Sequence, residues 1–187
     1  AKRIGASIAR RLAQEGVNLV VHYQASQVEA EALADDLQSS GVRTFTVQAD
    51  LAQPGAGTSL FTDALRLAGP IDILVNNASI FPEDSLEQLN ESRLALNMQV
   101  HALAPTELGR ALHAQGREGA ILNLLDARMN DYDKTHLSYH LSKRTLSALT
   151  RIMAVEFAPR LRVNGIAPGL SLPPPGKDTA YLEGLAH

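Results

Sequence analysis

The sequence predicts a doubly wound α/β fold, in which helices cover both faces of a parallel sheet. Helical and strand-like segments alternate along the 187 residues with short connections and no internal repeat. The strand-like segments are apolar throughout, which is typical of parallel strands buried on both faces. Polar or turn-forming residues follow most of these segments, at the edge of the sheet where ligands bind in such folds.

In the first half of the chain, each predicted element follows from a local pattern. The opening residues place Ile4, Ile8 and Leu12 on one helical face, and Gly16 ends that helix. Ser26 is expected to cap the second helix. The ranges predicted after Gly16 are a strand over 17–22, a helix from 26 to 37, a strand over 42–48 that ends at Asp50, and a helix over 58–68.

The second half continues the alternation. Gly69 and Pro70 turn the chain into a strand over 71–75, and residues 86–113 are mostly helical in pattern. Gly119 leads to a strand ending at Asp126. A helix through Tyr139 and Lys143 to about residue 158 and a strand over 161–166 follow. Residues 173–176, Pro-Pro-Pro-Gly, have the composition of a loop.

Composition narrows the classes of function. A chain of 20.1 kDa with 45% hydrophobic residues, 20% charged residues and a net charge of −3 fits one ordinary globular domain. Scattered Lys and Arg argue against a nucleic-acid partner, and no apolar run is long enough to cross a membrane. The absence of Cys fits a cytoplasmic protein. Six dispersed His predict no metal site.

One pair of residues suggests proton chemistry. Tyr139 and Lys143 are four residues apart in a helical pattern and therefore share a helix face. A nearby ammonium favours the phenolate and can lower the pKa of a Tyr toward the range of a proton donor. Such pairs also occur on solvated helices without any chemical role, so the pair alone decides nothing.

Three motifs in this order and spacing resemble the short-chain dehydrogenase/reductase family. They are Asn76-Asn77-Ala78 after a strand, Tyr139-x-x-x-Lys143, and the segment 162–169, Arg-Val-Asn-Gly-Ile-Ala-Pro-Gly. The resemblance covers nearly the whole chain. It implies that residues 1–187 are a single, partial, NADP-binding Rossmann-like reductase domain.

The chain resembles the pteridine reductase branch of this family. The resemblance rests on the opening Ala-Lys-Arg-Ile-Gly, on residues 168–171 and on two departures from the common family pattern. Asp126 stands where most members have Ser, and Ser79 follows Asn-Asn-Ala where most have Gly. That branch reduces dihydropterins, and in some members folates, with NADPH. Dihydromonapterin reductases are similar and carry the same Asp. The alternatives are reduction of a ketone, with Asp126 acting as Ser does elsewhere, and a catalytically silent NADPH-binding module.

The resemblance assigns the catalytic roles. Tyr139 would be the proton donor, and Lys143 would hold the nicotinamide ribose and tune Tyr139. Asp126 would help relay a proton to the pterin ring nitrogen, because hydride addition to a C=N bond leaves negative charge there. The other reading of Asp126 is a cap of the following segment. His101 or Asn97, one helical turn apart, would fill the family's fourth position; His101 is favoured, chiefly for its main-chain carbonyl.

The cofactor is expected to be NADPH. The end of the second strand lacks the acid that binds a ribose 2′-hydroxyl, although Ala25 stands where related reductases carry Arg. The residues implied to hold it are Arg3, Ile4 and Gly5 at a helix N-terminus, Tyr23, Gln24 and Ser26, Asp50 and Leu51, Asn76, Asn77 and Ala78, Lys143, and Pro168, Gly169 and Ser171.

Substrate contacts are implied for Ser79, Phe81 and Arg3, as well as for Asp126 and Tyr139. Phe81 would stack on the flat pterin ring. The alternative readings are that Phe81 packs in the core and that Arg3 is only a solvated residue of the first helical turn. No partner other than a small molecule and further copies of the chain is expected.

The family pattern extends past both ends of this sequence. Members begin with a strand and a Thr-Gly pair, and they end with a further helix and strand. We therefore expect the sequence to be part of a longer protein, with an unpaired position in the middle of its sheet. A mass near 20.1 kDa combined with full activity would contradict this. Family members pair through their long helices, so a dimer or tetramer is expected.

Overall fold

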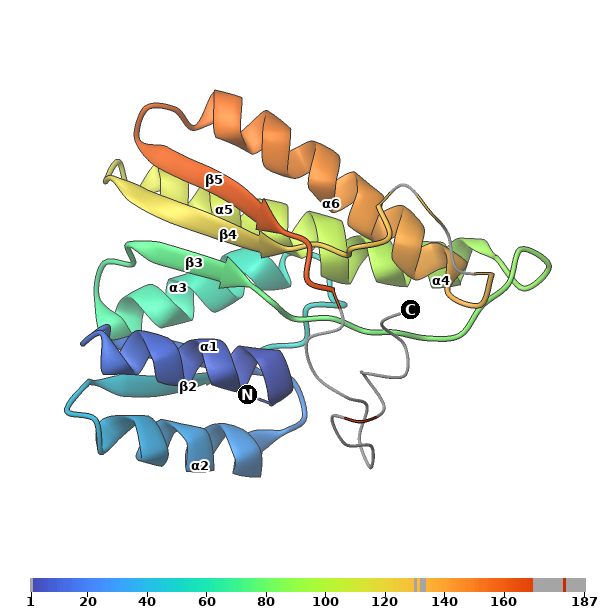
Figure 1. Cartoon of the computed structure of the whole chain (residues 1–187). Helices are drawn as coiled ribbons and strands as arrows, with labels where there is room; N and C mark the ends of the chain where they lie inside the picture. The colour runs from blue at the N-terminus through green and yellow to red at the C-terminus, as the bar shows by residue number, and fades with distance from the viewer. Residues whose placement is uncertain (1, 130, 132–133, 170–179, 181–187) are drawn as a thin grey trace.

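The computed structural model describes residues 2–129, 131, 134–169 and 180. Its elements alternate in the predicted order (Figure 1), and the tail at 173–176 and Ser171 lie outside the described residues. The elements are α1 Arg3–Gln14, β1 Leu19–Tyr23, α2 Gln27–Gln38, β2 Thr44–Gln48, α3 Ala56–Ala68, β3 Ile73–Asn76, α4 Glu91–Met98, the π-helical turn η1 Gln99–Leu103, α5 Ala104–Ala114, β4 Gly119–Leu124, α6 Leu137–Glu156 and β5 Leu161–Ile166.

Several boundaries differ from those predicted, because main-chain groups find partners outside the sheet or helix. The N–H of Val17 bonds to Leu12 at the end of α1, and the main chain of Ile71 bonds to the side chain of Gln115. The first residues of these apolar runs therefore precede the strands. The prediction that Ser26 caps α2 was wrong: it occupies the N-cap position, but its side chain makes no cap hydrogen bond. Asn90 does cap α4.

The strands form two parallel sheets, β1-β2 and β3-β4-β5. The two sheets are not hydrogen-bonded to each other, and β1 and β3 are edge strands of the two. A cavity of about 1040 Å³ is lined by both of these strands and by α1. The break lies where the sequence led us to expect an unpaired position in the sheet.

Helices cover both faces, as the predicted fold class requires. Residues from α3, α5 and α6 form one apolar cluster with β2, β4 and β5, and Val20 of β1 packs against it. Val21, the next residue, points to the opposite face and packs in a second cluster with α1 and α2. The predicted doubly wound architecture is therefore confirmed. No helix among the described residues is long and apolar enough to cross a membrane.

The buried face of α1 differs from the predicted one. Ala6, Ala9 and Ala13 are buried against the second cluster, whereas Ile8 and Leu12 line the cavity between the sheets. The small alanine side chains allow α1 to pack closely on its neighbours. The larger residues, which the sequence pattern assigned to the core, remain half-buried at the cavity wall.

Buried amides connect the strands to the helix behind them. The Asn76 amide donates to Asn123 at 2.8 Å, and the Asn123 amide donates to the Thr150 hydroxyl of α6 at 2.9 Å. Asn123 is 0% exposed, so these bonds satisfy polar groups that water does not reach. The network fixes the carboxyl ends of β3 and β4 beside α6, at the edge where the predicted site residues follow.

Candidate active site

The structure brings Asp126 and Tyr139 into direct contact. Asp126 follows β4 by two residues, and Tyr139 lies in the first turn of α6. The Tyr139 hydroxyl donates to Oδ2 of Asp126 at 3.0 Å, and Oδ1 accepts the N–H of Arg128 at 2.7 Å. The carboxylate therefore caps the following segment, the alternative reading of the sequence, while its other oxygen faces the predicted proton donor.

Lys143 reaches the same place from one turn further along α6. Its Nζ donates to the main-chain oxygen of Leu124 at 2.7 Å and lies 5.8 Å from the centre of the Tyr139 ring. The side chain is only 4% exposed. Burial lowers the pKa of Lys143 to about 8, although the Asp126 carboxylate acts in the opposite direction.

The sequence suggested that Lys143 could lower the pKa of Tyr139, whereas the pKa of this hydroxyl is raised in the structure. Burial raises the pKa of the Tyr139 hydroxyl. The Asp126 carboxylate raises it further by its charge and by accepting the hydrogen bond from this hydroxyl. Lys143 donates to a carbonyl instead of to the phenol. The hydroxyl is therefore held in its protonated form, which is the form a proton donor needs.

His101 is buried beneath Tyr139 and is 1% exposed. Its Nε2 accepts the N–H of Ile80 at 3.1 Å, with the Ser79 hydroxyl 3.0 Å away. Its Nδ1 lies 2.8 Å from the Ser142 hydroxyl, which itself donates to the carbonyl of Tyr139. These roles require a proton on Nδ1 and none on Nε2. Burial, followed by the nearby Lys143 charge, lowers the pKa of His101 to about 3.

Both candidates for the fourth family position contact α6. Asn97 is 0% exposed and donates to the Ser138 hydroxyl at 2.9 Å, one residue before Tyr139. His101 contacts Ser142, three residues after it. The contacts of His101 are made by its ring. The role expected for its main-chain carbonyl in the family's fourth position stays a prediction.

The predicted substrate contacts lie in front of Tyr139. Phe81 is 57% exposed, which excludes the alternative of core packing. Its ring stacks on His136 with centres 3.7 Å apart and meets Tyr139 edge-on at 4.7 Å. Ser79 is exposed, with its hydroxyl turned toward His101. Arg3 is exposed at the start of α1, and its predicted substrate contact stays a prediction.

The cavity between the sheets gathers most of the predicted cofactor residues. Arg3 and Ile4 lie in the first turn of α1 beside it, and Pro168 and Gly169 follow β5. Those that line the cavity are Gly5, Tyr23, Gln24, Ser26, Asp50, Leu51, Asn76, Asn77 and Ala78. Lys143 is not among them, because it belongs to the group around Tyr139.

Two of the predicted cofactor residues in the cavity wall make close contacts. A side chain at Gly5 would place its Cβ 2.7 Å from the side-chain amide nitrogen of Asn77, so any larger residue there requires Asn77 to shift. Asp50, two residues after β2, accepts hydrogen bonds from Gln24, Gln53 and the N–H of Ala52. Its carboxylate is therefore already occupied by three donors.

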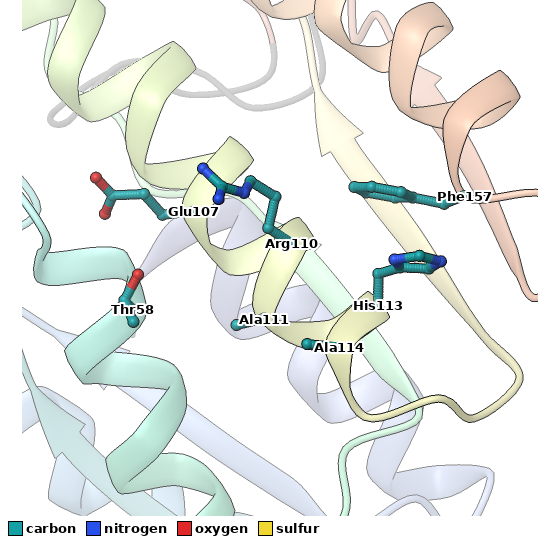
Figure 2. A pocket seen from close by; sticks show the side chains of 7 residues that line it. All are labelled: Thr58, Glu107, Arg110, Ala111, His113, Ala114 and Phe157. Carbon is teal, nitrogen blue, oxygen red and sulfur yellow. The ribbon is translucent and has the colours of Figure 1, made fainter.

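A second cavity, shown in Figure 2, lies apart from this site. It measures about 490 Å³ and is lined chiefly by α5, with Thr58 of α3 and Phe157 beyond the end of α6. Glu107 in its wall accepts the N–H groups of Gly55 and Gly57 and so joins α3 to α5. None of the predicted site residues lines it.

Sequence reasoning missed Asp84, Ser138 and Ser142. Each is almost fully buried and hydrogen-bonded at the start of α6. The two serines carry a weak signal, because they flank Tyr139 four residues apart and so share a helix face. Nothing in the local pattern around Asp84 indicates that it bonds to a residue 54 positions away.

Comparison with known proteins places the chain in a family. Residues 1–179 match the family model described as enoyl-(acyl carrier protein) reductase. The chain is 31% identical over 170 residues to an uncharacterized oxidoreductase of Methylorubrum extorquens, covering 90% of this chain and 68% of that protein. It is also 31% identical over 176 residues to 3-oxoacyl-[acyl-carrier-protein] reductase of Staphylococcus epidermidis, covering 89% and 70%.

Solved structures agree with this fold. FolM alternative dihydrofolate reductase 1 from Brucella suis, in complex with NADP, aligns with a TM-score of 0.86 and 37% identity over 92% of this chain and 73% of that one. A blue fluorescent protein from a metagenomic library, in complex with NADPH, gives 0.84 and 30% identity over 90% and 70%. The chain belongs to the short-chain dehydrogenase/reductase family of oxidoreductases.

Acid is expected to destabilise the fold through His101. The pKa of the buried ring is lowered from 6.5 to about 3, so the unfolded chain takes up the proton first as the pH falls. Its contribution to stability is complete above about pH 6.5 and is lost as the pH falls toward 3. His101→Gln does not titrate and should show a smaller loss.

Urea unfolding of both proteins at about pH 7.5 and about pH 5 measures this difference. Burial also lowers the pKa of His22, which acts in the same direction in both proteins. An equal decrease in the free energy of unfolding for the wild type and His101→Gln would contradict the assignment.

Proposed function

We propose that this protein is an NADPH-dependent reductase of a dihydropterin C=N bond, with folate as a further substrate class. The observation that carries the proposal is the hydrogen bond between Tyr139 and Asp126, an acid where most family members have Ser. The half-exposed Phe81 ring beside Tyr139 supports a flat aromatic substrate. The similarity to a protein named alternative dihydrofolate reductase agrees with this choice.

The cofactor supplies a hydride, two electrons and one hydrogen, to the carbon of the C=N bond. The residues of this chain deal with the charge that remains. Nitrogen gains negative charge, and the Tyr139 hydroxyl, held protonated by its surroundings, delivers a proton to it. Asp126 lies within hydrogen-bond distance of the same hydroxyl and is only half-buried, so it can return a proton from solvent to Tyr139.

Lys143 would hold the nicotinamide ribose and stabilise the tyrosinate during transfer. Its ammonium is already fixed by Leu124 and lies under the Tyr139 ring, so little reorganisation is required. The preference for NADPH over NADH is supported by the absence of an acid in Tyr23-Gln24-Ala25-Ser26 and by neighbours crystallised with NADP or NADPH.

Reduction of a ketone is the second candidate. The Staphylococcus epidermidis relative is named as a 3-oxoacyl reductase, and Tyr139 with Lys143 suits carbonyl reduction equally well. In that reaction Asp126 would only orient the carbonyl through Tyr139. A silent NADPH-binding module is the third candidate and would bind the cofactor without turnover.

NADPH oxidation with dihydrobiopterin, dihydromonapterin, dihydrofolate and a panel of ketones separates these candidates. We expect turnover with at least one of the three pterins, because Phe81 and Asp126 suit a flat ring with a C=N bond. Turnover with ketones alone would reject the pterin proposal. Cofactor binding without any turnover would favour the silent module.

Variants at Tyr139 and Asp126 test the proton path. Tyr139→Phe removes the donor and should lower kcat by about 10²- to 10⁴-fold. Asp126→Ala and Asp126→Asn should both lower pterin turnover, because neither Ala nor Asn can take up and release a proton, although Asn still accepts a hydrogen bond. NADPH affinity, measured by fluorescence titration, should change far less.

Asp35→Asn, at an exposed position of α2, serves as the control. Unchanged turnover in Asp126→Ala would show that the assigned role is wrong. Full activity in Asp126→Asn would mean that the carboxylate only positions Tyr139.

We also propose that copies of the chain associate in the cytoplasm as a dimer or tetramer through the long helices. Leu96, Leu103, Ile152 and Val155 of α4, η1 and α6 are large apolar side chains between 41% and 76% exposed. Light scattering gives the assembly mass. A monomer that remains fully active would contradict the proposal.

A further inference from the structure

The helix that carries Tyr139 begins without a cap of its own. His136 occupies the N-cap position of α6, but its side chain makes no cap hydrogen bond, and the first turn contains no acidic residue. Ser138 in that turn is 0% exposed, so its N–H cannot be satisfied by solvent. A distant residue must therefore provide the acceptor.

Asp84 provides it, from 54 positions earlier in the chain. Its carboxylate oxygens lie 3.2 and 3.3 Å from the Ser138 nitrogen and accept that N–H. Its main-chain oxygen accepts the N–H of Leu137, and its own N–H donates to the carbonyl of Thr135 at 2.7 Å. Asp84 thus satisfies the main-chain N–H groups of Leu137 and Ser138 at the start of α6. It also forms an isolated parallel β-bridge with His136, the residue before the helix.

The environment of Asp84 favours a cap over other roles. The side chain is 1% exposed, and the ion pairs formed between described residues do not include it. The positive end of the α6 dipole and the Ser138 N–H offset the cost of burying a carboxylate there. Asn97 adds to the same junction by donating to the Ser138 hydroxyl.

The segment 79–84 that ends at Asp84 also carries the predicted substrate contacts. Phe81 stacks on His136 and meets Tyr139 edge-on, while Ile80 is held by His101 from the other side. The segment is therefore held on both sides of Phe81, by His101 of η1 before it and by the start of α6 at Asp84 after it. A shift of Asp84 would move Phe81 and the first turn of α6 relative to each other.

We propose that Asp84 is a positioning residue of the active site, which caps α6 from the segment 79–84 and fixes Tyr139 relative to Phe81. It touches neither cofactor nor substrate and acts through the helix start. This inference rests on the proposed function, because it assigns Phe81 to the substrate and Tyr139 to proton transfer. Its structural half, the cap itself, can be tested without any activity.

Three variants test whether Asp84 acts by capping α6 or only by its negative charge. Asp84→Ala removes the acceptor and should lower kcat/KM by about 10- to 100-fold, since displacements of about 1 Å have effects of this size. Asp84→Asn keeps an acceptor and should stay within about 3-fold of wild type, because Asn caps as well as Asp. Glu83→Ala removes the exposed neighbouring acid and should leave activity unchanged.

NADPH affinity distinguishes positioning from general loss of structure. It should remain near wild type in Asp84→Ala, because the cavity between the sheets does not include Asp84. A parallel loss of NADPH affinity and kcat/KM would overturn the proposal. So would an Asn variant as impaired as the Ala variant, or an Ala variant as active as Glu83→Ala.

Hydrogen exchange provides the readout without activity. The amides of residues 137–139 should exchange faster in Asp84→Ala than in Asp84→Asn, while those of β4 stay unchanged. If Asp84→Ala does not fold, Asp84→Ser, whose hydroxyl still accepts a hydrogen bond, takes its place with a smaller change expected. Unchanged exchange at 137–139 would overturn the cap. A wild type without turnover would reject the proposed function and leave the exchange test valid.

Discussion

The buried start of α6 must satisfy its polar groups without water, and the candidate site is built around this constraint. Asp84 reaches it from one segment, and Asn97 and His101, one helical turn apart, reach it from another. They bond to Ser138 or Ser142 on either side of Tyr139. Each bond removes a penalty that an unpaired buried group would carry. The result is that the main chain around Tyr139 is held on both sides of its helical turn.

The same burial sets the protonation states of the site. Removing Lys143, His101 and Tyr139 from water favours the neutral form of each group. Asp126 stays half-buried and bonds to the tyrosine hydroxyl, so it connects the dry interior to solvent. Under the proposed function, the protonated Tyr139, an ammonium held by a main-chain carbonyl and a solvent-linked acid would serve reduction of a C=N bond.

The cavity between the sheets, where most of the predicted cofactor residues lie, depends on a different constraint. Here the main chain and small residues must leave room at the carboxyl ends of the strands. The parallel strands end at one edge, which gathers Tyr23, Asp50 and Asn76 although they are far apart in the sequence. Gly5 allows α1 to begin against Asn77. The cavity between β1 and β3 borders the group of residues around Tyr139 at Ser79. This residue lines the cavity, and its hydroxyl contacts His101.

The sequence by itself determined the fold class, the order of the elements and the pairing of Tyr139 with Lys143 on one helix face. These follow from hydrophobic patterns and helix geometry, which act over a few residues. Motif spacing also pointed to Asp126 and to nine of the residues that line the cavity between the sheets. Boundaries were less certain, because residues such as Val17 and Ile71 bond outside their predicted strands.

Only the tertiary structure decided the electrostatics and the supports of the site. The raised pKa of Tyr139 results from burial and from Asp126, and neither burial nor their contact can be read from the spacing of the two residues. The alanine face of α1 was decided by how closely that helix packs. Asp84 bonds to Ser138 only because the fold brings two segments together, and no local pattern carries that information.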